Sequence, residues 1–349
     1  MVVRVYLKQA WNLMKQNPLF STLYIVGTGI SIVMTMVIAI VYYVRLAPVY
    51  PETNRMRTLV VKSAKMTNDE STHSSNISYA MLKDWFYSLE SAEVSTGVSG
   101  TSYARVTNDK EEIPTYARYT DENFFRVFPL VFLEGKPFTE ADRRSGIHNV
   151  VLTDSYAQQL FGTTKGVVGK NFLMDYTNVK VVGVVKSGSF LTPDSYAQVY
   201  LPYSCRDGYD DEGSHWALGG YRVYILMKES KSVTDVQDEV LELVRKFNVS
   251  DMGDGWKLDL VGQPELYWHS TFRLWSNVAV DWGRVIWMFV GIFMVLLFVP
   301  AFNLSGMISA RMERQLPDLG IRKAFGASRR RLLVQIIWEN LLLTGLGTI

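Results

Sequence analysis

The residue types that most often do chemistry in proteins are sparse in this chain of 349 residues. It has one cysteine and four histidines, at positions Cys205, His73, His148, His215 and His269. No two histidines have the spacing of metal ligands, and no nucleophile motif surrounds the cysteine. We therefore interpret the histidines as surface or structural residues and predict no catalytic centre, no metal site and no cofactor.

The segment from Gly162 to Lys170 superficially resembles a phosphate-binding loop. In the motif G-x-x-x-x-G-K-[ST] ending at this lysine, the first glycine would stand at position 164, which is Thr164. Asn171 also follows the lysine, where the motif needs serine or threonine. The sequence thus predicts that this chain cannot hydrolyse ATP by itself and is not an enzyme.

Two polar residues stand inside long apolar runs. Asn303 lies three residues after Pro300, and Glu339 interrupts a run near the end of the chain. A proline in a membrane helix frees a carbonyl group that a neighbouring polar side chain can satisfy. A charged group at the membrane centre costs about 2.5–3.5 kcal/mol, so we expect Glu339 to face the interior of a bundle or dimer. The alternative is that Glu339 lies near the cytoplasmic surface and meets water.

The chain has three long apolar runs, and the second and third contain Asn303 and Glu339. Residues 19–44 carry no charge, and a helix of that length would be roughly 39 Å long, enough to cross a hydrocarbon core of about 30 Å. Residues 285–308 form a second uncharged run, which begins beside Trp282. A cleavable signal peptide and a buried core helix are the alternatives for these two, and both fit poorly with runs of this length. Residues 332–349 form a third, short span that ends with the chain, so we expect the sequence to be truncated there.

The charged residues divide the chain into three zones. Residues 1–47 carry four basic and no acidic residues, the middle zone 48–281 carries 24 basic and 31 acidic ones, and the remainder carries eight basic and three acidic ones. Cytoplasmic segments are enriched in lysine and arginine, so residues 1–18 and 309–331 are predicted to be cytoplasmic and the middle zone extracytoplasmic. The first of these has the pattern of an amphipathic helix on the membrane surface, or of an ordinary solvated helix. The total of 36 basic against 34 acidic residues argues against a nucleic-acid partner.

The two ends of the middle zone have the pattern of mixed α/β units. A strand is predicted at 58–61, followed by a helix that Ser78 caps, with apolar residues on one face at Leu82, Trp85, Phe86 and Leu89. Near the far end, a strand at 221–226, a helix capped by Ser232 or Thr234 and a strand at 256–260 are predicted. We expect these pieces to form one lobe.

Between them, the sequence predicts a β-rich second lobe inserted into the first. Strands are expected at 150–152, 179–185 and 198–201, with a turn at Thr177-Asn178. A short helix is expected to be capped by Asp154 and closed by Gly162. The fold class is therefore an α+β membrane protein, with a two-lobed mixed α/β extracytoplasmic domain between membrane helices 1 and 2.

Two groups of motifs carry a family resemblance. The first, near the C-terminal end, is Asp318-Leu319-Gly320-Ile321-Arg322-Lys323-Ala324-Phe325-Gly326-Ala327-Ser328, with Asn303 before it and Glu339, Gly345 and Gly347 after it. The second lies in the middle zone, at Asn123-Phe124-Phe125, Leu133 to Phe138, Ala157 to Gly162, Val168-Gly169-Lys170 and Val182 to Val185. With these motifs the chain resembles the FtsX/MacB-like ABC transporter permease family over nearly its whole length.

The resemblance implies a multi-pass protein of the bacterial inner membrane that forms a homodimer, or a heterodimer with a related permease. It implies a separate ABC ATPase that docks on the loop 309–331 and drives movement of the extracytoplasmic domain, for export, lipoprotein release or envelope mechanotransmission. The residues carried over as the docking site are Asp318, Gly320, Ile321, Arg322, Lys323, Gly326 and Ala327, with Asn303 and Glu339 as intramembrane polar residues. The family usually has glutamate where this chain has Asp318, and the carboxylate is kept.

The docking loop also has a physical interpretation. Pro317 suits the first turn of a new helix, Gly326 can end that helix, and Ser328 can cap the next span. The arginines of the loop would lie near anionic membrane lipid. The alternatives are a plain positively charged loop without a partner and, for the whole chain, a membrane-anchored extracytoplasmic sensor or ligand-binding protein without a transport role.

Overall fold

The computed structural model describes residues 18–298 apart from 101, 109–110, 207, 210–215 and 251–254, and beyond residue 298 only positions 321, 324, 334 and 337. The chain divides into two compact units. One is Tyr43–Asp281, here called the domain, and the other combines Met1–Tyr42 with Trp282–Ile349.

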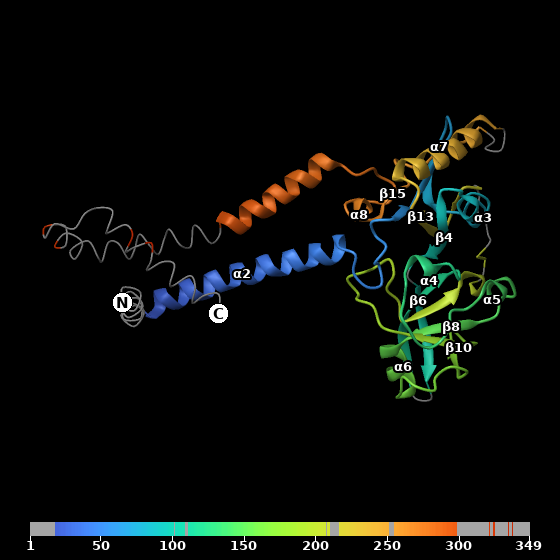
Figure 1. Ribbon diagram of the computed structural model, residues 1–349, viewed down its shortest axis with the longest axis horizontal. Helices are drawn as coiled ribbons and strands as arrows, with labels where there is room; N and C mark the ends of the chain where they lie inside the picture. The colour runs from blue at the N-terminus through green and yellow to red at the C-terminus, as the bar shows by residue number, and fades with distance from the viewer. Residues whose placement is uncertain are drawn as a thin grey trace. The chain divides into compact units, whose positions relative to one another are not determined.

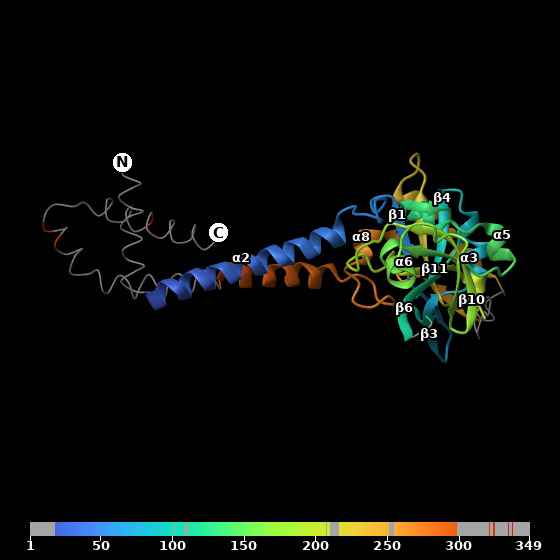
Figure 2. The same cartoon turned by 90° about the horizontal axis from the view of Figure 1, so that it is seen from below.

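Helix α2, Pro18–Leu46, covers the first predicted span as one continuous helix (Figures 1 and 2). Two of its hydroxyl groups bond within the helix, because Ser31 donates to the Gly27 carbonyl oxygen and Thr35 to that of Ser31. Among the described residues, one helix is long and apolar enough to cross a membrane, over Ile25–Leu46.

A shorter apolar helix, Trp282–Phe298, begins the second predicted span. Its Phe289 ring lies 5.0 Å from that of Tyr42 on α2. Most of the third predicted span, and the rest of the second, lie outside the described residues.

The first sheet of the domain joins strands from the two ends of the middle zone. Its strands are β1 (Thr58–Val61), β2 (Ala64–Thr67), β3 (Thr72–Ile77), β4 (Ala92–Ser99), β12 (Leu218–Gly219), β13 (Tyr221–Met227), β14 (Lys257–Asp259) and β15 (Glu265–Leu266). Strand β13 is antiparallel to both β1 and β4, so that Tyr224 pairs with Val60 and with Thr96. The strands predicted at 58–61, 221–226 and 256–260 are confirmed and lie in this one sheet.

Strand β1 shows how the layers are built. Leu59 and Val61 belong to the apolar cluster that also holds α7, whereas Val60 belongs to the cluster shared with the second sheet. Side chains alternate between the two faces of a strand, and all four residues of β1 are buried. The first sheet is therefore covered on both faces.

Two predicted helices cover the first sheet. Ser78 caps α3, Tyr79–Asp84, and accepts a hydrogen bond from the Met81 amide. The helix ends earlier than its apolar pattern indicates, because residues 86–88 form the 3-10 turn η1, Phe86–Ser88. Helix α7, Val233–Val249, begins with a reciprocal cap between Ser232 and Asp235.

The second sheet closes on itself. Its strands are β5 (Ser102–Asn108), β6 (Glu111–Thr120), β7 (Phe132–Gly135), β8 (Asn149–Thr153), β9 (Asn171–Met174), β10 (Thr177–Val185) and β11 (Val199–Pro202). Strand β9 pairs with both β5 and β10, which joins the ends of the order β10-β8-β11-β6-β5-β9 into a ring. The smaller helices of the domain are α4 (Phe124–Val127), α5 (Glu140–Arg144), α6 (Asp154–Phe161), η2 (Tyr203–Cys205) and α8 (Tyr267–Ser270).

Two local predictions in the second sheet are wrong. Thr153 is the residue before α6, and Asp154 is its first helical residue, where its carboxylate accepts from the amides of Ser155 and Ser187. The turn before β10 lies at Asp175-Tyr176, both with positive φ, because Thr177 and Asn178 already pair with β9. The end of α6 at Gly162, with φ 69°, is confirmed.

Candidate functional site at the end of helix α2

Of the predicted docking residues, Ile321 is the one that lies among the described residues. Ile321 is helical and exposed. The other predicted site residues lie outside the described residues: Asn303, Asp318, Gly320, Arg322, Lys323, Gly326, Ala327 and Glu339.

The described residues hold a different polar site, where α2 enters the domain. Arg55 donates to the carbonyl oxygen of Val44, in the last turn of α2, and to that of Ala47, directly after the helix, the latter at 2.9 Å. Its other nitrogens bind the carboxylate of Glu52, with Nε to Oε2 at 2.8 Å. A cation at a helix C-terminus satisfies free carbonyl groups and interacts favourably with the helix dipole. Arg55 thus fastens the last turn of α2 to the domain, and we call this contact the first arginine clamp.

Burial makes this clamp sensitive to change. Glu52 is 1% exposed and Arg55 3% exposed. Burial raises the pKa of Glu52, and the guanidinium of Arg55 opposes that shift. Ser195 donates to the other oxygen of Glu52 at 2.7 Å. Since Ser195 lies in the loop between β10 and β11, the clamp reaches the second sheet as well.

A second buried carboxylate, Asp194, lies beside Ser195 in the same loop. Lys62, directly after β1, and Arg222 on β13 both approach it at 3.2 Å. Burial disfavours the charge of Asp194, but the two cations outweigh burial and hold its pKa well below the usual range. Arg118 on β6 donates to the Pro193 carbonyl oxygen at 2.7 Å. The loop 186–196 is therefore held by ion pairs to the first sheet and by hydrogen bonds to the second.

The second connection between the units has an arginine of its own. Arg273 binds Glu265 of β15 and donates to the carbonyl oxygens of Val261 and Val278, at 2.9 and 2.7 Å. The side chain of Arg273 is 3% exposed. We call this contact the second arginine clamp, because it fixes the chain shortly before Trp282. Each passage between the units thus has one arginine clamp, and the second is bound directly to the first sheet through Glu265.

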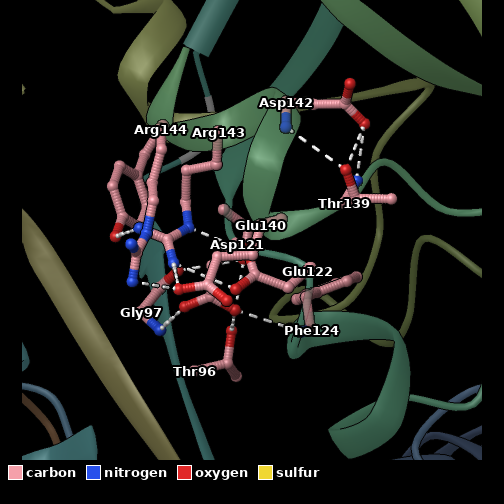
Figure 3. Close-up of polar contacts among 12 residues, drawn as sticks. Thr96, Gly97, Asp121, Glu122, Phe124, Thr139, Glu140, Asp142, Arg143 and Arg144 are labelled. Atoms are coloured by element: carbon pink, nitrogen blue, oxygen red, sulfur yellow. Dashed lines mark hydrogen bonds and ion pairs between the residues drawn. The ribbon is translucent and has the colours of Figure 1, made fainter. Parts of the chain in front are cut away.

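A further buried carboxylate joins the two sheets. Asp121, at the end of β6, accepts hydrogen bonds from Thr96 Oγ1 at 2.6 Å, the Gly97 amide at 2.9 Å and Tyr87 Oη at 2.5 Å (Figure 3). Thr96 and Gly97 belong to β4 of the first sheet. Burial raises the pKa of Asp121 to about 6, although its hydrogen-bond donors favour the charged form.

Next to it, Arg143 of α5 makes a two-pronged ion pair with Glu122, at 2.8 and 3.0 Å (Figure 3). Arg143 also donates to Tyr203 Oη at 2.9 Å. A two-pronged arginine–carboxylate pair fixes orientation as well as distance. This pair ties α5 and η2 to the segment after β6, beside the Asp121 contacts.

The contacts described above position segments of the domain relative to one another. No group of three histidine, cysteine, aspartate or glutamate side chains that could hold a metal occurs among the described residues. Burial raises the pKa of Cys205 to about 12, which disfavours the thiolate form that acts as a nucleophile.

Sequence reasoning missed both clamps. The available signal was an E-x-x-R spacing, Glu52 to Arg55, directly after the first apolar run, and a lone Arg273 before the second. Their partners could not be found in this way, because Ser195 is 143 residues from Glu52.

Comparisons with known proteins place the chain in a family. Residues 20–243 match the model of the MacB-like periplasmic core domain, and residues 277–349 match the FtsX-like permease C-terminal model.

Relatives of known name are similar over about two thirds of this chain. The pyoverdine export ATP-binding/permease protein PvdT of Pseudomonas fluorescens (strain Pf0-1) is 24% identical over 246 residues, covering 67% of this chain and 34% of the relative. The macrolide export ATP-binding/permease protein MacB of Escherichia coli O157:H7 is 21% identical, covering 70% and 35%. The ABC transporter permease YvrN of Bacillus subtilis (strain 168) is 22% identical, covering 66% and 54%. The chain thus spans about a third of the length of the first two relatives and about half of the third.

Solved structures are also similar. The periplasmic region of MacB from Actinobacillus actinomycetemcomitans matches with a TM-score of 0.41 and 16% identity, covering 57% of this chain and 88% of that one. The extracellular domain of the noncanonic ABC-type transporter YknZ from Gram-positive bacteria matches with a TM-score of 0.39 and 16% identity, covering 56% and 99%. Because the periplasmic core domain model alone matches well over half of the chain, the protein belongs to the FtsX/MacB-like family of ABC transporter permeases.

Proposed function

We propose that this protein is the permease subunit of an ABC-type system in which a separate ATPase drives movement of the extracytoplasmic domain. The work done there is export, lipoprotein release or envelope mechanotransmission. The chain spans the membrane several times, acts as a homodimer or heterodimer, and carries no hydrolytic centre of its own. Movement of two lobes, one around each sheet, is part of this proposal.

The observation that carries the proposal is the first arginine clamp. A helix that only anchors a domain needs no buried ion pair at its end, and a flexible linker would serve. Here Arg55 binds two carbonyl groups at the end of α2, and its partner Glu52 binds Ser195 in the loop that leads into the second sheet. A displacement of α2 would therefore move both sheets rather than bend a linker.

The ATPase is proposed to dock on the loop 309–331, through the residues that the family resemblance assigns. A short helix between Pro317 and Gly326 would present Arg322 and Lys323 to the ATPase, and Asp318 would favour its first turn. Family membership supports this assignment, since the FtsX-like match covers residues 277–349.

The docking site can be tested by recovery of the ATPase from detergent-solubilised membranes that contain the full-length permease. Gly326→Val forces a β-branched residue into a turn that needs positive φ, and Arg322→Glu reverses a charge at the contact. Both changes are expected to abolish recovery while membrane insertion stays intact, with Asp318→Ala milder. Arg311→Glu, a charge reversal in the same loop outside the motif, is the matched control and should recover the ATPase normally.

The second candidate is a membrane-anchored sensor or ligand-binding protein without a transport role. It predicts normal behaviour of both severe variants, because no ATPase would bind this loop. Equal recovery from wild type, Gly326→Val and Arg322→Glu would therefore remove the docking assignment and favour the sensor.

A further inference from the structure

Large apolar side chains are exposed on the segments that flank the two clamps. Phe190, in the loop between β10 and β11, is 74% exposed, and Leu274 and Trp275, after α8, are 65% and 67% exposed. We propose that these three residues, the apolar foot, contact the headgroup region of the extracytoplasmic leaflet of the membrane. The inference rests on the proposed function, since it requires α2 to cross the membrane.

The end of α2 fixes the level of the membrane surface relative to the first clamp. Tyr43 is 66% exposed near the end of the apolar run, and tyrosine and tryptophan favour the membrane–water interface. Leu46 lies three residues later, a rise of about 4.5 Å, while the headgroup layer is roughly 5–8 Å thick on each side. The carbonyl groups of Val44 and Ala47 that bind Arg55 would therefore lie within this layer or at its outer edge.

Phe190 stands in a loop whose two sides are anchored next to that level. Tyr50 Oη donates to the Lys186 carbonyl oxygen at 2.8 Å, and Ser195 donates to Glu52 at 2.7 Å. Tyr50 and Glu52 follow Leu46 by four and six residues. The loop 186–195 is thus bonded on both sides of Phe190 to the segment that has just left α2.

Leu274 and Trp275 are held near the other passage. The Val278 amide donates to the Trp275 carbonyl oxygen at 3.2 Å, and Arg273 of the second clamp donates to the Val278 carbonyl oxygen. Trp282, the start of the apolar helix, is four residues after Val278, and this stretch reaches at most about 14 Å when extended. Trp275 is therefore kept within a short reach of the second span.

Lipid explains these exposed residues better than a protein partner does. They lie on two segments that are far apart in sequence, and each segment is fixed to a passage into a proposed span. Phenylalanine, leucine and tryptophan are the side chains that interfacial membrane segments bury at the headgroup boundary. A foot that rests on the leaflet would resist tilting of the domain while the clamps transmit movement of the helices.

The test places one fluorescent NBD label at a time on the full-length chain, in nanodiscs of phosphatidylethanolamine and phosphatidylglycerol. Phe190→Cys and Trp275→Cys, made in a Cys205→Ser background, report on the foot, and both positions are exposed, so the changes leave the core intact. Tyr176→Cys, at the exposed hairpin tip between β9 and β10, is the control for water, and Met36→Cys in α2 is the control for lipid. Quenching by doxyl groups on lipid is compared with quenching by iodide in water.

We expect labels at positions 190 and 275 to have blue-shifted emission and to be quenched by doxyl lipid more strongly, and by iodide more weakly, than the label at position 176. If the label at position 36 is quenched by lipid while those at 190 and 275 behave like the label at 176, the membrane contact of the apolar foot is contradicted. The crossing of the membrane by α2 is then still supported. If the label at position 36 is not quenched by lipid, both the crossing of the membrane by α2 and the membrane contact of the apolar foot are contradicted. Shielding of 190 and 275 from both quenchers would mean that protein covers them, which also overturns the foot.

Discussion

Arg55 and Glu52 differ from the surface ion pairs of the domain in their burial. The pair between Arg57 and Glu229 leaves the glutamate 83% exposed, and such pairs contribute about 0–1 kcal/mol. A buried pair is also weak as a net source of stability, because desolvation offsets the attraction. Removal of one partner is different, since it leaves the other charge buried and alone.

Arg55→Gln should therefore lower the free energy of unfolding by about 3–5 kcal/mol. Glu52 would stay buried without its cation, and the carbonyl groups of Val44 and Ala47 would lose their charged donor. Urea unfolding of the protein in detergent, followed by tryptophan fluorescence, measures this change. Arg245→Gln, at a side chain that is 72% exposed, is the control and should shift stability by less than about 0.5 kcal/mol. The double change Glu52→Gln/Arg55→Gln should lose less than Arg55→Gln, and a larger loss would contradict the interpretation.

Asp121 should make stability depend on pH in a defined direction. Its pKa is about 6 in the folded protein and 3.8 when unperturbed, so the folded state binds more protons between these values. The free energy of unfolding should therefore fall as pH rises from about 4 to about 6, by up to about 3 kcal/mol, and stay level above that. Asp121→Asn should clearly reduce this slope in urea titrations across the range, and the remainder belongs to Glu52, whose pKa burial also raises. Asp235→Asn, at the exposed cap of α7, should keep it, and an unchanged slope in Asp121→Asn would rule out the assignment to Asp121.

At the scale of elements, the sequence predicted strands and helices where apolar residues follow a clear period. Strand 58–61 and helix α7 are examples, and the predicted cap of α7 by Ser232 is confirmed. Strand β4 was missed because its residues, AEVSTGVS, are small or polar, although seven of the eight are buried between two layers. Strand β3, THSSNI, is mostly exposed and has no apolar period. The ring of the second sheet depends on the pairing of β9 with β5, a contact between distant segments that local patterns do not contain.

The packing of β12 against the start of α3 gives a test at this scale. A Cβ atom added at Gly219 would lie 2.5 Å from the Cα atom of Ser78 and 2.9 Å from the Ile77 carbonyl oxygen, both backbone atoms that cannot move alone. At its neighbour Gly220, the nearest atom would be at 3.7 Å. Gly219→Ala should destabilise the domain by about 1–3 kcal/mol, whereas Gly220→Ala should change little. Equal melting temperatures for the two variants would show that the close approach is not a constraint.

At the scale of the whole molecule, the two units are joined by two short passages, and a buried arginine binds each of them. Charge zones and apolar runs predicted the passages from the sequence, because membrane orientation depends on composition. They could not predict the clamps, which depend on residues brought together from the loop 50–57, the loop 186–196 and the segment after α8. The proposed coupling would therefore depend on the folded domain rather than on any local motif.

Hydrogen exchange in the full-length permease with its ATPase tests this coupling most directly. Addition of a non-hydrolysable ATP analogue should change amide exchange in the extracytoplasmic domain of the wild type, first in segments 50–57 and 186–196 beside the first clamp. In Arg55→Gln, with the ATPase still bound, the change should stay on the cytoplasmic side and not reach residues 58–270, whereas Arg245→Gln should behave like wild type. No nucleotide-dependent change in the wild-type domain, or an equal change in Arg55→Gln, would contradict transmission of ATP-driven movement through the first arginine clamp.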